Sequence, residues 1–461
     1  MDQQYFASSA FLPQGWAENV LITVDKTGNI SNISPNQSLS STATLLKGIV
    51  LPGMLNLHSH AFQRAMAGLA EQAIGEKGSF WTWRELMYQF LAKLTPEDLQ
   101  IIASQVYVEM LKAGYTTVGE FHYVHHQPNG QPYQDPSLTS QHIIAAAKET
   151  GIAISHLPTL YHYSGFGGQP AAANQKRFIN DESQILDLIS SLLTRYARDP
   201  QVTIGLAHHS LRAISPEMLR QATEGMKSLA PQSPIHIHIA EQIKEVNDCL
   251  RWSAQRPVEW LLNNMDIDQS WCLVHATHMT EIETQRLASS GAIAGLCPTT
   301  EANLGDGLFN LPDYLDAGGR WGIGSDSNIS VSMIEELRLL EYGQRLLRRE
   351  RTLVKTAAEP SVGTTLYQMA LRGGTQALGR SAGSIEMGKR ADFIVLDEHM
   401  PALLSRTNSL ILDSLIFSGN VNPIRHVIAG GQQVVKDFKH VAEEKLLNSY
   451  ANTIKKLLGS R

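Results

Sequence analysis

The chain has 461 residues, of which 43% are hydrophobic, and a formal net charge of −6 at pH 7. This much apolar sequence can bury a large core, which excludes a globally disordered protein. A mildly acidic surface attracts neither nucleic acid nor an anionic membrane, so we expect neither as a partner. A small anionic substrate stays compatible with the composition, because local arginines can dominate a pocket.

The cysteines and the first residues bear on the compartment. Three cysteines form no CxxC pair and no disulfide framework, so we expect free thiols in a reducing compartment. The first residues, MDQQYFASSAF, lack the basic and apolar regions of an export signal. No run of about 18 apolar residues could span a bilayer. These features predict a cytoplasmic location.

The two ends of the chain share one pattern. Residues 1–50 and the residues from about 383 carry short alternating segments separated by turn signals. We expect 1–50 and 383–461 to pair into one small β-sandwich domain, with a helix at 441–458. Residues 51–382 would then form a second domain.

The middle of the chain alternates apolar runs with helical patterns, which predicts an α/β fold with parallel strands buried on both faces. Eight such units close naturally into a (β/α)8 TIM barrel. A doubly wound open sheet is the alternative, but no GxGxxG phosphate loop supports it. The expected strands are 51–58, 115–121, 152–158, 202–209, 235–240, 271–277, 292–298 and 320–326.

Helix signals separate these strands. Thr95-Pro96-Glu97-Asp98 and Ser215-Pro216-Glu217 each combine an N-cap, a proline at the first helical position and acidic residues. They predict helices ending near Ala113 and over 216–228. Residues 159–180 are rich in Gly, Pro and Asn and follow the third strand, so we expect a long loop at the catalytic rim of the barrel.

Metal-ligand residue types stand at the carboxyl ends of four expected strands. His58 and His60 end the first strand on one face, because residues i and i+2 of a strand point the same way. His238, His275 and Asp326 end the fifth, sixth and eighth strands. One such histidine alone is more often structural, but joint placement at one barrel rim favours a zinc-like site. His236 lies deeper on the fifth strand, and we interpret it as a core residue.

The motifs at these strand ends, HSH, HIAE, VHAT and SD, resemble those of the amidohydrolase superfamily, deaminase branch. GSIEMGKRADFIVLD resembles that superfamily's small β domain. More narrowly, NLHSHAFQRAMAGLAE and SFWTWRELMY resemble the formimidoylglutamate deiminase family. The resemblance implies metal-dependent hydrolysis of N-formimidoyl-L-glutamate to N-formyl-L-glutamate and ammonia, a step of histidine degradation.

The resemblance also implies roles for individual residues. One divalent ion, zinc before iron or manganese, would be held by His58, His60, His238 and Asp326. A lysine that bridges two metals in dinuclear relatives is missing beside His208 and His209, which favours a single ion. Glu241, His275 and Asp326 would be catalytic, although an acid like Glu241 can also simply begin a helix.

A dicarboxylate substrate needs cations, and the guanidinium group pairs with carboxylates in bidentate fashion. Arg84 and Arg212 are the candidates, against the alternative of surface ion pairs. The resemblance implies that Gln63, Tyr123 and His209 also contact substrate, and that the protein is a homodimer.

Two other classes of function remain to be distinguished. Another deaminase or chlorohydrolase of the superfamily would share the metal ligands and act on a purine, pyrimidine or related heterocycle, without needing both arginines. A barrel that had lost catalysis could serve as a scaffold, but every expected ligand type is present.

Overall fold

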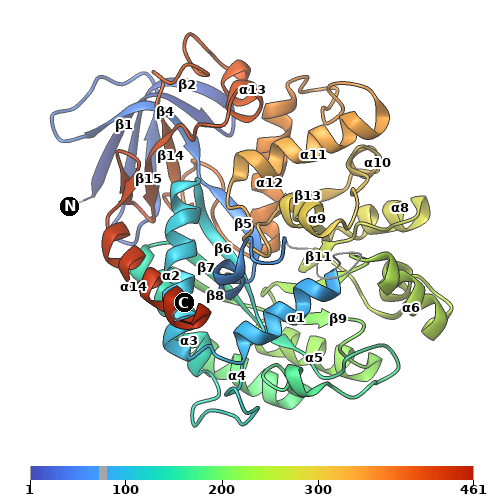
Figure 1. The fold of residues 1–461 in the computed structure, drawn as a ribbon. Helices are drawn as coiled ribbons and strands as arrows, with labels where there is room; N and C mark the ends of the chain where they lie inside the picture. Colours follow the sequence, from blue (N-terminus) through green and yellow to red (C-terminus); the bar gives the residue numbers. More distant parts are fainter. Residues whose placement is uncertain (1, 72–79, 460–461) are drawn as a thin grey trace.

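The structure is a computed structural model that describes residues 2–71 and 80–459, with the side chains of residues 80–85 outside the description. Two sheets organise the described residues: a parallel barrel and a smaller sheet beside it (Figure 1). The predicted combination of a TIM barrel with a β unit from both chain ends is confirmed.

Each of the eight expected runs contributes to the barrel, with residues 202–209 divided into two short strands. The order around the sheet is β13-β12-β11-β10-β9-β7-β6-β5, and β8 pairs with β7. The strands are β5 (Met54–Ser59), β6 (Tyr115–His122), β7 (Ala153–Leu160), β8 (Val202–Ile204), β9 (Leu206–Ser210), β10 (Ile235–Ile239), β11 (Trp271–His275), β12 (Ile293–Leu296) and β13 (Arg320–Ile323).

The barrel closes where the segment after β13 meets β5. The Asp326 amide donates to His58 O at 2.9 Å, and the His60 amide donates to Asp326 O at 2.9 Å. These bonds form the parallel bridge between Ser59 and Asp326. The backbones of three expected metal ligands therefore form the hydrogen bonds that close the barrel, at the seam between β5 and the segment after β13.

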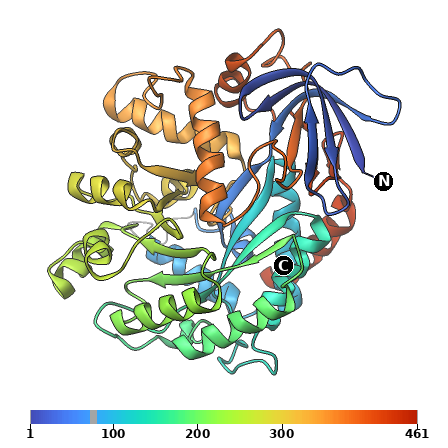
Figure 2. The ribbon, with the colours of Figure 1, turned by 180° about the vertical axis from the view of Figure 1, so that it is seen from behind.

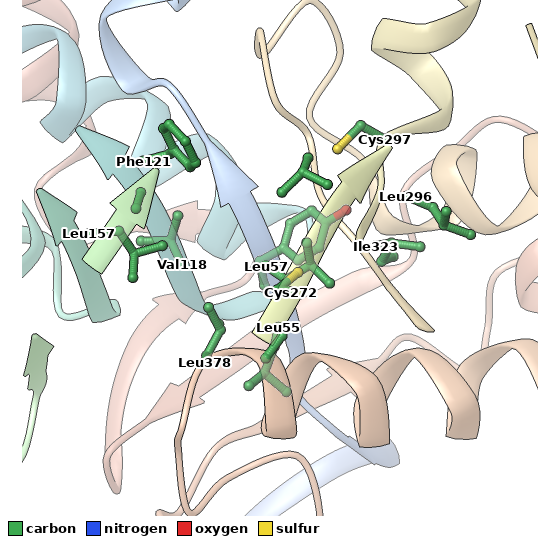
Figure 3. Close-up of a cluster of buried hydrophobic side chains, with 14 of the residues drawn as sticks. Leu55, Leu57, Val118, Phe121, Leu157, Cys272, Leu296, Cys297, Ile323 and Leu378 are labelled. Atoms are coloured by element: carbon green, nitrogen blue, oxygen red, sulfur yellow. The ribbon is translucent and has the colours of Figure 1, made fainter. Parts of the chain in front are cut away.

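The barrel interior is filled with apolar side chains from facing strands, including Leu55, Leu57, Val118 and Leu157 (Figure 3). Leu378, at the end of α12 (Val362–Ala377), joins this cluster from the amino-terminal side of the strands. Its carbonyl accepts from Ser155 Oγ at 2.8 Å. The amino-terminal mouth is thus sealed, and the carboxyl ends of the strands are left for chemistry.

Helices surround the barrel, and their starts follow the sequence signals. Thr95 and Asp98 form the capping box of α2, and the Ser215 side chain caps α5. The remaining loop segments include the 3-10 turns η1 (Ala61–Met66) and η2 (Ala173–Gln175). The helices are α1 (Phe80–Leu91), α2 (Pro96–Lys112), α3 (Leu138–Thr150), α4 (Glu182–Arg195), α5 (Pro216–Leu229), α6 (Ile243–Ser253), α7 (Pro257–Asn264), α8 (Glu281–Ser290), α9 (Pro298–Leu304), α10 (Leu311–Asp316), α11 (Met333–Arg348), α12, α13 (Ser409–Phe417) and α14 (Glu443–Leu458).

The second sheet is built from both ends of the chain and curls over its own core (Figure 2). Its order is β17-β16-β15-β14-β4-β1-β2-β3. The strands are β1 (Gln3–Leu12), β2 (Gly15–Val24), β3 (Ile30–Ser34), β4 (Thr44–Pro52), β14 (Phe393–Leu396), β15 (Ile424–Ala429), β16 (Gln432–Lys436) and β17 (Lys439–His440). β4 is central, since it pairs in parallel with β1 and antiparallel with β14.

The two sheets join closely. Only Gly53 separates β4 from β5, so the chain passes from the small sheet into the first barrel strand without a loop. The predicted carboxyl-terminal helix is confirmed as α14, and it packs on α2 of the barrel. The division into domains at residues 51 and 383 stays a prediction. No helix among residues 2–71 and 80–459 is long and apolar enough to cross a membrane.

Close packing of α12 on β13 yields a stability prediction. A Cβ at Gly373 would lie 1.7 Å from the Trp321 carbonyl oxygen, so Gly373→Ala must displace backbone. We expect a loss of about 3 kcal/mol or more in the free energy of unfolding, the upper end of overpacking costs, measured by urea denaturation.

Gly343→Ala in α11 is the matched control. Its Cβ meets the flexible end of the Leu308 side chain, and alanine is favoured over glycine in a helix by about 1 kcal/mol. Equal stability of the two variants would contradict the packing assignment.

Candidate metal centre and active site

Three histidines converge at the carboxyl ends of β5 and β10. His238 Nε2 lies 3.1 Å from His58 Nε2 and 3.3 Å from His60 Nε2. Asp326 Oδ1 lies 3.4 Å from Nε2 of both His58 and His60. All four side chains are buried. The structure thus brings together the four predicted ligands, which come from the first, fifth and eighth strands of the barrel.

Hydrogen bonds at Nδ1 of His60 and His238 determine whether Nε2 of each ring carries a proton or a lone pair. His60 Nδ1 lies 2.9 Å from Phe121 O, and His238 Nδ1 lies 2.9 Å from His209 O. A carbonyl only accepts, so each Nδ1 carries the proton and each neutral ring turns a lone pair at Nε2 towards the other. Burial lowers the pKa of both rings, which disfavours a proton between them.

Such facing lone pairs are stable around a cation, and the cluster fits one. Ligands about 2.0–2.1 Å from a four-coordinate zinc ion lie about 3.4 Å apart, close to the separations in the cluster. Burial also lowers the pKa of His58 to about 3, which keeps its imidazole neutral as a ligand must be. The donor set of three imidazoles and one carboxylate suits zinc or another borderline divalent ion.

His275 lies beside this cluster among acidic groups. Its Nε2 is 3.8 Å from Asp326 Oδ2 and 3.9 Å from Glu241 Oε1. Burial lowers the pKa of His275, but the carboxylates of Glu241, Glu301 and Asp326 outweigh burial and raise it to about 10. Burial raises the pKa of Glu241 above its ordinary value. The site therefore places the His275 imidazole beside the carboxyl groups of Glu241 and Asp326, and burial raises the pKa of the first of these. This arrangement suits proton transfer.

The backbone around these groups is unusually shaped. Ala240, His275 and Asp326, at or just after the ends of three strands, have φ values of 51°, 70° and 46°. This left-handed region is uncommon for residues other than glycine and recurs at functional sites. Glu245 supports the turn after β10, since its carboxylate accepts from the amides of Ala240 and Glu241 at 3.2 Å each.

The predicted substrate residues Gln63, Tyr123, His209 and Arg212 line one cavity with Glu241, His60, His238 and Asp326. Gln63 Nε2 donates to Tyr123 OH at 2.9 Å, while Gln63 Oε1 has no partner among the described residues. The Nε atom of Arg212 is likewise buried without a partner in that set. Arg84 is on α1, and its side chain lies outside the described residues.

Two further histidines lie outside the metal-ligand cluster, and the cysteines form no disulfide. His236 Nε2 lies 2.7 Å from Ala377 O, beneath the cavity, as expected for a core residue. His208 faces outward, with Nε2 3.0 Å from Thr223 Oγ1 on α5. The three cysteines are free and buried.

Sequence reasoning missed an aromatic wall and a buried acid. Tyr161 and Phe178, from the two ends of the 159–180 loop, line the cavity, and the Tyr161 ring centroid lies 4.3 Å from that of His209. Glu301 Oε1 lies 3.2 Å from His275 Nδ1. The sequence contains a clue to Glu301, because CPTTEANL follows the seventh strand at the same rim of the barrel. An acidic residue at this position is, however, also common at the start of a helix.

Comparison with known proteins decides the family. The family model described as "Amidohydrolase family" matches residues 49–434. The chain belongs to the amidohydrolase family. It is 49% identical to formimidoylglutamate deiminase of Pseudomonas aeruginosa over 454 residues, covering 98% of this chain and 99% of that protein.

Solved structures agree with the assignment. The crystal structure of an amidohydrolase from Brucella melitensis has a TM-score of 0.94 and 42% identity, covering 99% of this chain and 100% of that one. An adenosine deaminase from Xanthomonas campestris with bound zinc shares the fold, with a TM-score of 0.82, 19% identity, and coverage of 99% and 98%. Amidohydrolase family enzymes use a divalent metal ion, and this chain is a hydrolase of that family rather than a scaffold.

Metal binding yields a second prediction. His238→Ala removes the nitrogen that lies within 3.3 Å of two other predicted ligand nitrogens, so we expect metal affinity to fall on the order of 100-fold or more. Metal per chain is measured by mass spectrometry after dialysis.

His208→Ala is the control, since this outward-facing histidine lies on the neighbouring strand and is equally buried. Equal metal loss in the two variants would contradict the ligand assignment.

Proposed function

We propose that the chain is a formimidoylglutamate deiminase, which converts N-formimidoyl-L-glutamate and water to N-formyl-L-glutamate and ammonia in histidine degradation. A relative of that name, 49% identical over nearly the whole chain, supports the proposal. One feature of the site carries it: Arg212 lines the same cavity as Glu241, His60, His238 and Asp326. A cation there binds a substrate carboxylate while the acid faces the amidine.

Attack by water is the first half of the reaction. A divalent ion bound to His58, His60, His238 and Asp326 would supply Lewis acidity and lower the pKa of water. His275 and Asp326 face the cavity together, with Nε2 and Oδ2 3.8 Å apart. Both orient the attacking water, and Asp326 accepts its proton. A carbon–oxygen bond then forms at the formimidoyl carbon.

Loss of ammonia is the second half. Glu241, whose pKa burial raises, keeps a larger fraction in its acid form than an exposed glutamate. It donates its proton to the imino nitrogen and recovers one that came from the water. The second hydrogen of the water reaches the same nitrogen, the carbon–nitrogen bond breaks, and ammonia leaves.

The two carboxylates of the substrate are held by arginines. Arg212 binds one of them through its guanidinium group, and Arg84 binds the other. Gln63, Tyr123 and His209 bind the remaining polar atoms of the substrate. Gln63 Oε1, which has no donor among the described residues, suits an N–H of the formimidoyl group, because a buried carbonyl oxygen without a donor is costly until the substrate supplies one.

We also propose the identity of the metal ion and the oligomeric state and location of the protein. The ion is a single zinc ion, supported by the cluster of three histidines with Asp326 3.4 Å from two of them, and by the absence of lysine at positions 208 and 209. The protein is a cytoplasmic homodimer that binds neither nucleic acid nor membranes. Three buried free cysteines suit a reducing compartment.

The function itself is tested by ammonia release. Protein of measured metal content is given N-formimidoyl-L-glutamate, and guanine, cytosine and adenosine as alternatives. We expect release from the first compound alone, its loss on chelation, and its return with added zinc. Release from a heterocycle instead would favour the second class of function, a heterocycle deaminase, and would overturn the proposed substrate.

Glu241→Gln tests the proton donor. The amide keeps the size of the side chain but cannot donate a carboxylic acid proton, so we expect kcat to fall about 100- to 10,000-fold, the usual contribution of general acid–base catalysis. Metal content should stay unchanged.

Glu245→Gln is the control. The Glu245 carboxylate accepts from the backbone amide of Glu241, so this variant shows the effect on kcat of disturbing the local fold without changing the Glu241 side chain. Glu241→Gln with near-normal kcat and full metal would exclude Glu241 as the donor.

A further inference from the structure

Glu301 is a buried carboxylate that contacts His275 from behind the cavity. Its side chain is 4% exposed, and its Oε1 lies 3.2 Å from His275 Nδ1. The backbone amide of Cys297 donates to the same oxygen at 2.9 Å. Glu301 lies on α9, directly after the seventh barrel strand, and it is not among the residues that line the cavity.

The two nitrogens of the His275 ring therefore face different surroundings. Nδ1 faces Glu301, while Nε2 faces Glu241 and Asp326 at 3.9 and 3.8 Å. A carboxylate at Nδ1 holds the proton there and limits rotation of the ring, which leaves Nε2 directed into the cavity. The contact thus holds a proton at Nδ1 and sets the orientation of the imidazole.

We propose that Glu301 is the positioning residue for His275 in catalysis. The role of His275 in the reaction rests on the proposed function, whereas the contact itself does not. Glu301 acts through His275 and touches neither the substrate nor the reacting atoms.

A metal site is the competing explanation for this cluster, since the ligand atoms of His275, Cys297 and Glu301 lie within 4.8 Å of one another. Hydrogen bonds account for it better. Glu301 Oε1 already accepts from an amide and faces the ring nitrogen. Burial raises the pKa of the Cys297 thiol well above its ordinary value, so the thiolate that a metal binds is disfavoured.

Glu301 Oε1 contacts both the Cys297 amide and His275 Nδ1. Variants at Glu301 can therefore separate the effect of its negative charge from its effect on the orientation of His275. In Glu301→Gln the Cys297 amide keeps the side-chain oxygen at its present place, where it still accepts from His275 Nδ1. Glu301→Ala removes the acceptor altogether. The pair of variants therefore distinguishes loss of charge from loss of positioning.

Glu336 provides the matched control. It is equally buried and also supports α9, since its carboxylate accepts from Thr299 N at 2.9 Å and from Thr299 Oγ1 at 2.6 Å. The bonds found for it among the described residues include none to a histidine. Glu336→Ala reports the cost of losing a buried acid from this region without altering the contact to His275.

The experiment measures ammonia release from N-formimidoyl-L-glutamate by the metal-loaded variants. We expect Glu301→Ala to lower kcat about 10- to 100-fold, as loss of an orienting partner does, with KM and metal content close to those of the unchanged protein. Glu301→Gln should lose no more than about fivefold in kcat, and Glu336→Ala should keep kcat. Full kcat in Glu301→Ala, or an equal loss in Glu336→Ala, would overturn the proposal.

A readout independent of turnover completes the test. In protein labelled with ¹⁵N-histidine, with His275→Asn used for assignment, we expect a protected Nδ1–H signal from His275 that Glu301→Gln keeps and Glu301→Ala loses. The signal also decides the case if Glu301→Ala does not fold, because Glu301→Asp is too short to reach both partners and should lose it. Unchanged protein that releases no ammonia would refute the proposed function, while persistence of the signal in Glu301→Ala or Glu301→Asp would refute the role of Glu301.

Discussion

The seam between the first and last barrel strands is the constraint on which the site depends. His58, His60 and Asp326 exchange backbone hydrogen bonds across it at 2.9 Å, so the peptide groups that close the barrel belong to residues that aim their side chains at one point. Asn56 and Asn328 reinforce the seam: Asn56 Oδ1 accepts from the Ser325 amide at 3.1 Å, and Asn328 Nδ2 donates to His60 O at 3.2 Å. A shift of one residue at this seam would turn alternate side chains away from the cluster.

The rest of the site is built outward from that seam by groups that leave each side chain little freedom. His60 and His238 are oriented by carbonyls, Glu241 stands on a turn that Glu245 caps, and His275 is held at Nδ1 by Glu301. Preorganisation of this kind places donors and acceptors before the substrate arrives, which is where much of the catalytic advantage of enzymes originates. The left-handed backbone at Ala240, His275 and Asp326 stores strain that the surrounding packing must offset.

Sequence reasoning predicted the parts of the molecule that follow from short-range pattern. Buried strands read as apolar runs, so all eight barrel strands and the His58–His60 pair were found, and capping residues located α2 and α5. Contacts between distant segments were harder. Nothing in the local pattern pairs Glu301 with His275 or brings Tyr161 and Phe178 from the ends of one loop to the same wall. The roles of Arg84 and its companions came from resemblance and stay proposals.

The pairing of β4 with β14 has a consequence for synthesis of the chain. Pro52 pairs with Phe393, so during synthesis β4 has no partner on its β14 side until about 340 more residues have been made. At typical translation rates of about 5–20 residues per second, this edge stays open for roughly 20–70 s. The open edge carries Ile49, Val50 and Leu51, an apolar run of the kind that invites pairing with other chains. The nascent protein therefore needs shielding at its amino-terminal end for most of its time on the ribosome.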